Sequence, residues 1–72
     1  MLEEIERWDK EARELRRRGV DWDRVNRLPP RLRAAIKYYI ETGEIRVASR
    51  LAGLPILKFR ELLRELKVPV VS

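Results

Sequence analysis

Glycine and proline constrain this 72-residue chain more than any other feature, because they divide it into short stretches. The breaks fall at Gly19, at Pro29–Pro30, at Gly43 and at Gly53, which Pro55 follows closely. Between these breaks the apolar residues recur every three or four positions, which is the period of an amphipathic helix. We therefore expect one all-α domain, residues 1–72, built from four or five short helices.

The first stretch, residues 2–18, predicts a helix with one apolar stripe. The stripe consists of Leu2, Ile5, Trp8, Ala12 and Leu15. Since a domain this small has little core, we expect the stripe to pack into it. Its heptad-like spacing also suits a partner helix, and in that alternative Trp8 and Leu15 belong to a protein interface of a homodimer. The basic end, Arg16–Arg18, falls in the last turn, where cations stabilise the negative end of the helix dipole.

Two further helices are expected before the middle of the chain. Asp21 is a candidate N-cap for a short helix at residues 22–28, with Trp22 packed over it. Pro30 suits the first turn of a helix at residues 30–42, since a proline there loses no hydrogen bond. Gly43 ends that helix.

Residues 44–67 have the pattern of a helix-turn-helix. Ala48 and Ser49 are small where the second helix has to cross the first, and Gly53 allows the positive φ of a tight turn. Ile45, Leu51 and Ala52 flank the buried face of the first helix. The second helix repeats apolar residues at helical spacing, and these should be core: Ile56, Phe59, Leu62, Leu63 and Leu66. Residues 68–72, with proline and β-branched side chains, predict an extended tail.

Charge points to a polyanionic partner. Seventeen Lys and Arg against 12 Asp and Glu give a net charge of +5, and the surplus is largest, +3, in residues 43–72. Arg60, Arg64 and Lys67 follow the outward edge of the second helix. Arg46 and Arg50 lie on the outer face of the helix before it. We predict that these five cations contact double-stranded DNA, with Arg60 or Arg64 reaching a guanine and the others holding phosphates. The alternative is a solvated helix face whose arginines pair with Glu61 or Glu65.

Leu57 does not fit a purely basic DNA-reading surface. It falls among the outward residues at the start of the second helix, where it could touch a thymine methyl group or lie in a protein interface. A protein-interaction module without direct DNA binding is therefore the alternative function.

Other classes of function lack the residues that they need. The chain has no histidine and no cysteine, so we expect no enzyme, no metal site and no cofactor. No apolar run approaches the roughly 18 residues of a membrane span, and we expect a cytoplasmic protein that does not enter membranes. Glutamine is absent and asparagine occurs once, a composition typical of thermophilic sources.

The stretch "YYIETGEIRVASRLAGLPILKFRELLRELKVPVV" resembles a family of small archaeal and bacterial helix-turn-helix proteins that are often described as antitoxins of toxin-antitoxin pairs. The likeness covers about residues 32–71. It rests on Gly43, Ile45, Ala48, Leu51, Ala52, Gly53, Leu54, Phe59, Leu62, Leu63, Pro69 and Val70. Lys67–Val68 departs from the family pattern, since a glycine often precedes the closing element there. The resemblance implies a small transcriptional regulator or antitoxin-like component, with DNA and a toxin protein as partners.

Overall fold

The computed structural model describes residues 2–70, with side chains from Trp8 onward, and over that range it contains helices and no strand. The five helices are α1 (Leu2–Arg17), α2 (Trp22–Arg27), α3 (Pro30–Thr42), α4 (Ile45–Ala52) and α5 (Ile56–Glu65). The expected all-α architecture of four or five short helices is confirmed. α4 and α5 are joined by the three-residue turn 53–55.

The core forms around α3, which packs against α1, α2 and α4. Tyr39 of α3 and Phe59 of α5 meet edge to face, with ring centroids 6.4 Å apart. The largest fully buried side chains are Tyr39, Phe59, Ile36, Ile40, Leu63 and Val25. Val68 of the tail joins this core, so the tail is packed down as far as residue 68. Residues 71–72 of the expected tail lie outside the described residues.

Local backbone chemistry agrees with the predicted helix ends. Asp21 caps α2, its Oδ1 accepting a hydrogen bond from the Arg24 amide at 3.2 Å. Gly43 and Gly53 follow α3 and α4 with φ of 72° and 71°. This left-handed conformation is cheap for glycine, and it lets the chain turn at once into the next helix.

Three arginines close the C-terminal ends of three helices from elsewhere in the chain. Arg16 donates from Nε to the Ile40 carbonyl at 2.8 Å, at the end of α3. Arg31 donates from Nε to the Leu51 carbonyl at 2.8 Å, at the end of α4. Arg24 donates from Nη1 to the Glu65 carbonyl at 3.3 Å, at the end of α5. Each cation lies where the helix dipole is negative, so these contacts tie α1, α2 and α3 to the elements that follow them.

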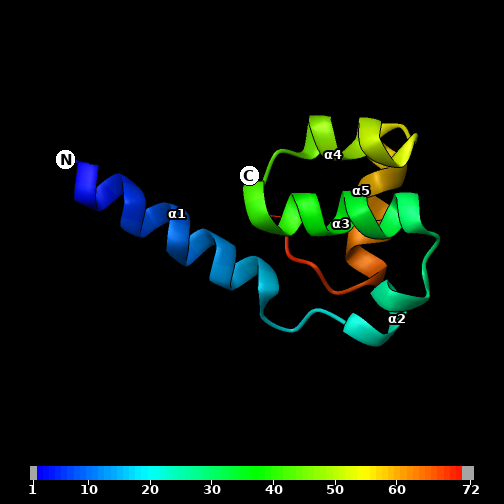
Figure 1. Cartoon of the computed structure of the whole chain (residues 1–72), viewed down its shortest axis with the longest axis horizontal. Coiled ribbons are helices and arrows are strands. Elements are labelled where there is room, and N and C mark those ends of the chain that lie inside the picture. The colour runs from blue at the N-terminus through cyan, green and yellow to red at the C-terminus, as the bar shows by residue number, and fades with distance from the viewer. Residues whose placement is uncertain (1, 71–72) are drawn as a thin grey trace.

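The expectation that the stripe of α1 is core is wrong for the residues whose side chains are described. Trp8 is 68% exposed and Leu15 is 48% exposed. The N-terminal half of α1 extends away from the other helices, and only its C-terminal end meets them (Figure 1). The reason is that Arg16, and not the stripe, faces α3, so α1 docks through its last turns. The side chains of Leu2 and Ile5 lie outside the described residues.

Trp22, which was expected to pack over α2, is 39% exposed, and two residues of α4 and α5 are likewise more exposed than predicted. Leu51 points outward because α4 buries Ala48, Ser49 and Ala52, a face turned toward Ser49 and away from Leu51. Ile56 is 37% exposed because it opens α5, where no earlier turn of that helix lies beneath it. Both therefore contribute to the exposed apolar surface of the corner between α4 and α5.

Candidate nucleic-acid interface

Four cations line one surface pocket where the end of α1, the second half of α5 and the tail meet. Its volume is about 660 Å³. The lining residues are Arg18, Arg60, Arg64, Lys67, Val68, Pro69 and Val70. No acidic residue is among them. We call this hollow the basic pocket.

α5 supplies three of the cations through its helical period. Arg60 and Arg64 are one turn apart, and Lys67 follows three residues later, so all three fall along one edge. The adjacent face of α5 is anchored in the core by Phe59 and Leu63, which immediately precede Arg60 and Arg64. Burial of these two side chains thus directs the basic edge outward.

Lys67 has a backbone conformation that is unusual for a residue other than glycine. Its φ is 60°, and among the described residues other than glycine it alone has a positive φ. Its amide donates to the Arg64 carbonyl at 3.1 Å, and the Val68 amide donates to the Leu63 carbonyl at 2.9 Å. These two bonds form the Schellman pattern, which usually carries glycine at this position. A lysine therefore stands where the backbone favours glycine, at the mouth of a pocket that its side chain lines.

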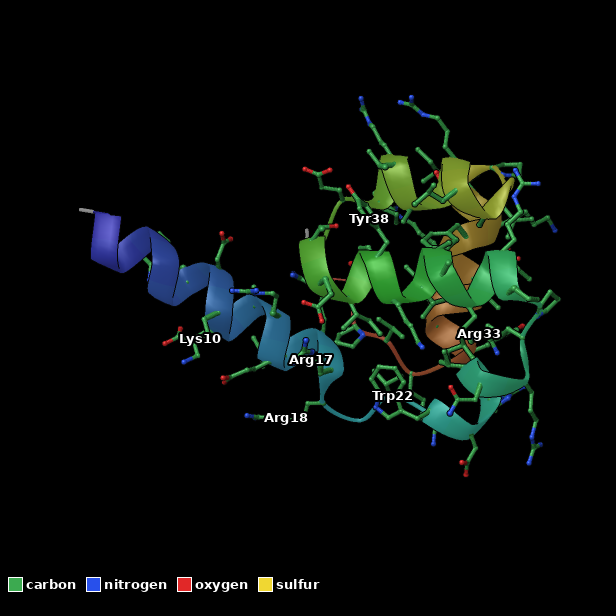
Figure 2. The ribbon with its side chains drawn as sticks, viewed as in Figure 1. Lys10, Arg17, Arg18, Trp22, Arg33 and Tyr38 are labelled. Atoms are coloured by element: carbon green, nitrogen blue, oxygen red, sulfur yellow. The ribbon has the colours of Figure 1, made fainter. Side chains whose placement is uncertain are left out.

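The fourth cation, Arg18, comes from the other end of the chain. Arg16 and Arg17 fix the end of α1 on α3, and Arg18 leaves it in a different direction from Arg17 (Figure 2). Arg17 pairs with Glu41. The pKa of the Glu41 carboxyl is lowered below its ordinary value, first by the hydrogen bond from Arg17 and also by the positive charges of Arg17, Arg13 and Arg16. The same contacts that dock α1 thus bring Arg18 to the basic pocket.

The cations of the basic pocket are not neutralised by neighbours within the described part of the chain. The ion pairs there join Arg17 to Glu41 and Lys58 to Glu61, the second at 3.9 Å. The alternative in which Arg60 or Arg64 pairs with Glu61 or Glu65 is therefore not what the structure shows. Four uncompensated cations around one hollow produce a positive potential that attracts an anion.

The structure unites some of the predicted DNA contacts and separates others. Arg60, Arg64 and Lys67 lie together in the basic pocket. Arg46 and Arg50 are exposed on α4, one turn apart, and do not line it. Arg18 was missed, since its position at the end of a helix was explained by capping alone. The charge run Arg16–Arg18 was the available signal, but only the tertiary fold shows which of its members is left without a partner.

The predicted protein-interface residues are all exposed. Leu57 is 73% exposed on α5, and Trp8 and Leu15 are exposed on α1. Leu57 therefore points outward as predicted, although exposure alone does not decide between DNA and protein.

The described residues also bear on two other kinds of site. No group of three or more carboxylates, histidines or cysteines comes together there in a way that could hold a metal ion. None of the described helices combines the length and the apolar character that crossing a bilayer requires.

Comparison with known proteins identifies no relative: no protein-family model, curated protein or solved structure matches the chain.

Proposed function

We propose that this protein binds double-stranded DNA, with α4 and α5 acting as a helix-turn-helix. The observation that carries the proposal is the basic pocket, in which Arg18, Arg60, Arg64 and Lys67 surround one hollow without a carboxylate. A phosphate backbone is the polyanion that such a cluster suits, because each neutralised phosphate releases a bound counterion. In this arrangement the pocket holds phosphates beside α5, while Arg60 or Arg64 can also reach a guanine edge.

Arg46 and Arg50 form a second set of contacts in this proposal. They are exposed on α4 and do not line the basic pocket. A helix-turn-helix crosses the DNA backbone with its first helix while its second enters the major groove. We propose that these two arginines hold phosphates on the α4 side of the groove. The protein would act as a homodimeric cytoplasmic regulator or antitoxin-like component.

Salt dependence of binding tests the proposal. Fluorescence anisotropy of a labelled generic duplex is measured at about 50 mM and about 200 mM salt. The four cations of the basic pocket contribute about −3.6 to the slope of log K against log salt, or about 150-fold weaker binding at the higher salt, and contacts from Arg46 and Arg50 add to this. In Arg60→Gln/Arg64→Gln two contacts are lost, and the slope should become shallower by about 1.8.

The matched control removes the same charge elsewhere. Arg27 and Lys58 are exposed and lie outside the basic pocket. The double variant Arg27→Gln/Lys58→Gln lowers the net charge by the same two units, and its slope should stay near the wild-type value. No salt-dependent binding by the wild type, or equal losses in the two double variants, would end the proposal of a DNA site at this pocket.

The second candidate function is binding of a protein partner, including a toxin, at the corner between α4 and α5. The exposure of Leu57, a large apolar side chain on the outward face of α5, favours it. Leu57→Asp should then abolish binding of that partner and leave salt-dependent DNA binding in place. If Leu57→Asp instead weakens only DNA binding, the leucine belongs to the DNA interface.

A further inference from the structure

α1 presents an apolar stripe that is largely exposed where its side chains are described. Trp8 and Leu15, on this stripe, are 68% and 48% exposed, and Ala12 between them is half-buried. The helix accounts for much of the long dimension of a molecule that measures 39 × 23 × 18 Å (Figure 1). A tryptophan on a projecting helix exposes a large apolar surface to water, which is unfavourable unless a partner covers it.

We propose that the partner is α1 of a second copy of this chain, packed antiparallel. The proposal rests on the proposed homodimer and adds which surface forms it and in which orientation. A two-fold axis beside Lys10 places position i opposite position 20 − i of the partner. Trp8 then packs against Ala12 of the partner subunit, and Leu15 lies opposite position 5 of the partner helix.

Side-chain size supports this register. Facing layers pack densely when a large residue lies opposite a small one. The antiparallel register pairs the largest residue of the stripe, Trp8, with its smallest, Ala12, twice. A parallel pair would instead set Trp8 against Trp8 and Ala12 against Ala12, which overfills one layer and leaves a void in the next.

Charge supports the antiparallel orientation independently. Residues 2–11, the acidic half, contain five acids and two bases, a net charge of −3. Residues 12–18, the basic half, contain one acid and four bases; Arg16 is buried against α3 and Arg17 pairs with Glu41, so Arg13 and Arg18 are the cations left to meet acids of the partner. Antiparallel pairing sets each acidic half against the basic half of the partner, and parallel pairing sets like against like. Asp9 and Glu11 flank the stripe on opposite sides close to the two-fold axis, so each lies near the same residue of the partner helix. The like charges there give the centre of the seam no favourable charge interaction.

The docking of α1 gives a third, steric reason. The other four helices lie at the C-terminal end of α1, and its N-terminal half is free (Figure 1). Parallel pairing would bring two folded bodies to the same end of the seam. Antiparallel pairing places them at opposite ends, each beside the projecting half of the other chain's helix.

Sedimentation equilibrium of the full chain without DNA tests the pairing. We expect a reversible dimer in the wild type. Trp8→Glu should raise the dissociation constant by at least about 30-fold, because Trp8 occurs twice at the centre of the interface. The matched control is Leu57→Glu, which also replaces an exposed large apolar residue by a carboxylate and should leave the dimer unchanged. Since both positions are exposed, both variants should keep the wild-type circular dichroism.

Spin-label distances test the orientation. The chain contains no cysteine, so a single Lys10→Cys or Glu3→Cys gives one labelling site per copy. With a rise of about 1.5 Å per residue, antiparallel pairing offsets the two labels along the helix axis by about 0 Å at position 10 and about 21 Å at position 3. Parallel pairing gives no axial offset at either position. A clearly longer distance at position 3 than at position 10 supports the proposal, and equal distances refute it.

The remaining outcomes separate this proposal from the proposed DNA binding. A monomeric wild type that still binds duplex in a salt-dependent way would refute the pairing and leave DNA binding standing. A dimer that Trp8→Glu dissociates, but that binds no duplex, would support the pairing and remove the DNA site. Loss of the dimer in Leu57→Glu but not in Trp8→Glu would refute the seam and place the contact at the corner between α4 and α5.

Discussion

Arg16 connects α1 to α3 through a buried cation, and replacing it by methionine should destabilise the fold. The residue is 7% exposed, and its Nε and Nη2 donate to the Ile40 and Glu41 carbonyls at 2.8 and 3.4 Å. Its guanidinium carbon also lies 6.0 Å from the centroid of the Tyr39 ring. Methionine retains an unbranched apolar stem of comparable length, so Arg16→Met removes chiefly the charge and the donors.

The size of the effect follows from these contacts. A hydrogen bond from a charged donor contributes about 1.5–3 kcal/mol net, and the second, longer bond contributes less. The interaction with the helix dipole is largely the same attraction, and the cost of burying the cation offsets part of the sum. We expect a net loss of about 2 kcal/mol, from a total that for 72 residues is about 4–11 kcal/mol. The midpoint of thermal unfolding should fall by about 8–16 °C.

Urea unfolding followed by circular dichroism measures this loss, with Arg17→Met as the control. Arg17 is the neighbouring residue and also reaches α3, but its pair with Glu41 is exposed and screened by solvent. That variant should lose less than about 1 kcal/mol. The reasoning fails if the two variants lose equal stability, because burial of the guanidinium and not its charge alone is the proposed cause.

Three further substitutions test the residues with positive φ. Gly43 and Gly19 both have positive φ, but a Cβ at Gly43 would lie 2.8 Å from Nη1 of Arg16, whereas nothing lies within 4 Å at Gly19. Gly43→Ala should therefore lower the free energy of unfolding by about 1 kcal/mol more than Gly19→Ala does, as measured by thermal unfolding. Equal losses in the two variants would contradict a stabilising contact of Arg16 beside Gly43. Lys67→Gly removes the steric strain of a non-glycine residue at positive φ and should raise the free energy of unfolding by up to about 1 kcal/mol. The same variant loses one cation and should reduce the salt slope of DNA binding by about 1. A less stable variant, or an unchanged slope, would speak against a strained lysine retained for binding.

Helix positions were predictable because they depend on local chemistry. Gly43 and Gly53 take the left-handed φ that their places in the sequence predicted, and Asp21 caps α2 as expected. The period of Phe59 and Leu63 likewise predicted the buried face of α5 and therefore its basic edge. Each of these features involves residues within a few positions of one another, so propensity and periodicity suffice to find them.

The basic pocket was only partly predictable. Arg60, Arg64 and Lys67 share one edge of a helix, which sequence spacing reveals. Arg18 lies 42 positions before Arg60, and its arrival beside α5 depends on the contacts of Arg16 and Arg17 with α3. No local pattern encodes such a contact, because three consecutive arginines at a helix end look alike until the fold gives two of them partners.

The stripe of α1 marks the boundary between the two kinds of information. Its apolar period predicts that residues 2–17 form a helix with one apolar face, and this depends only on residues a few positions apart. Whether this face is core, dimer seam or open surface depends on how far α1 extends past α3. The contact of Arg16 with the C-terminal end of α3 sets that position. A buried cation at that end leaves Trp8 beyond the reach of the core, so an amphipathic pattern that predicts packing became, in the folded chain, an exposed surface.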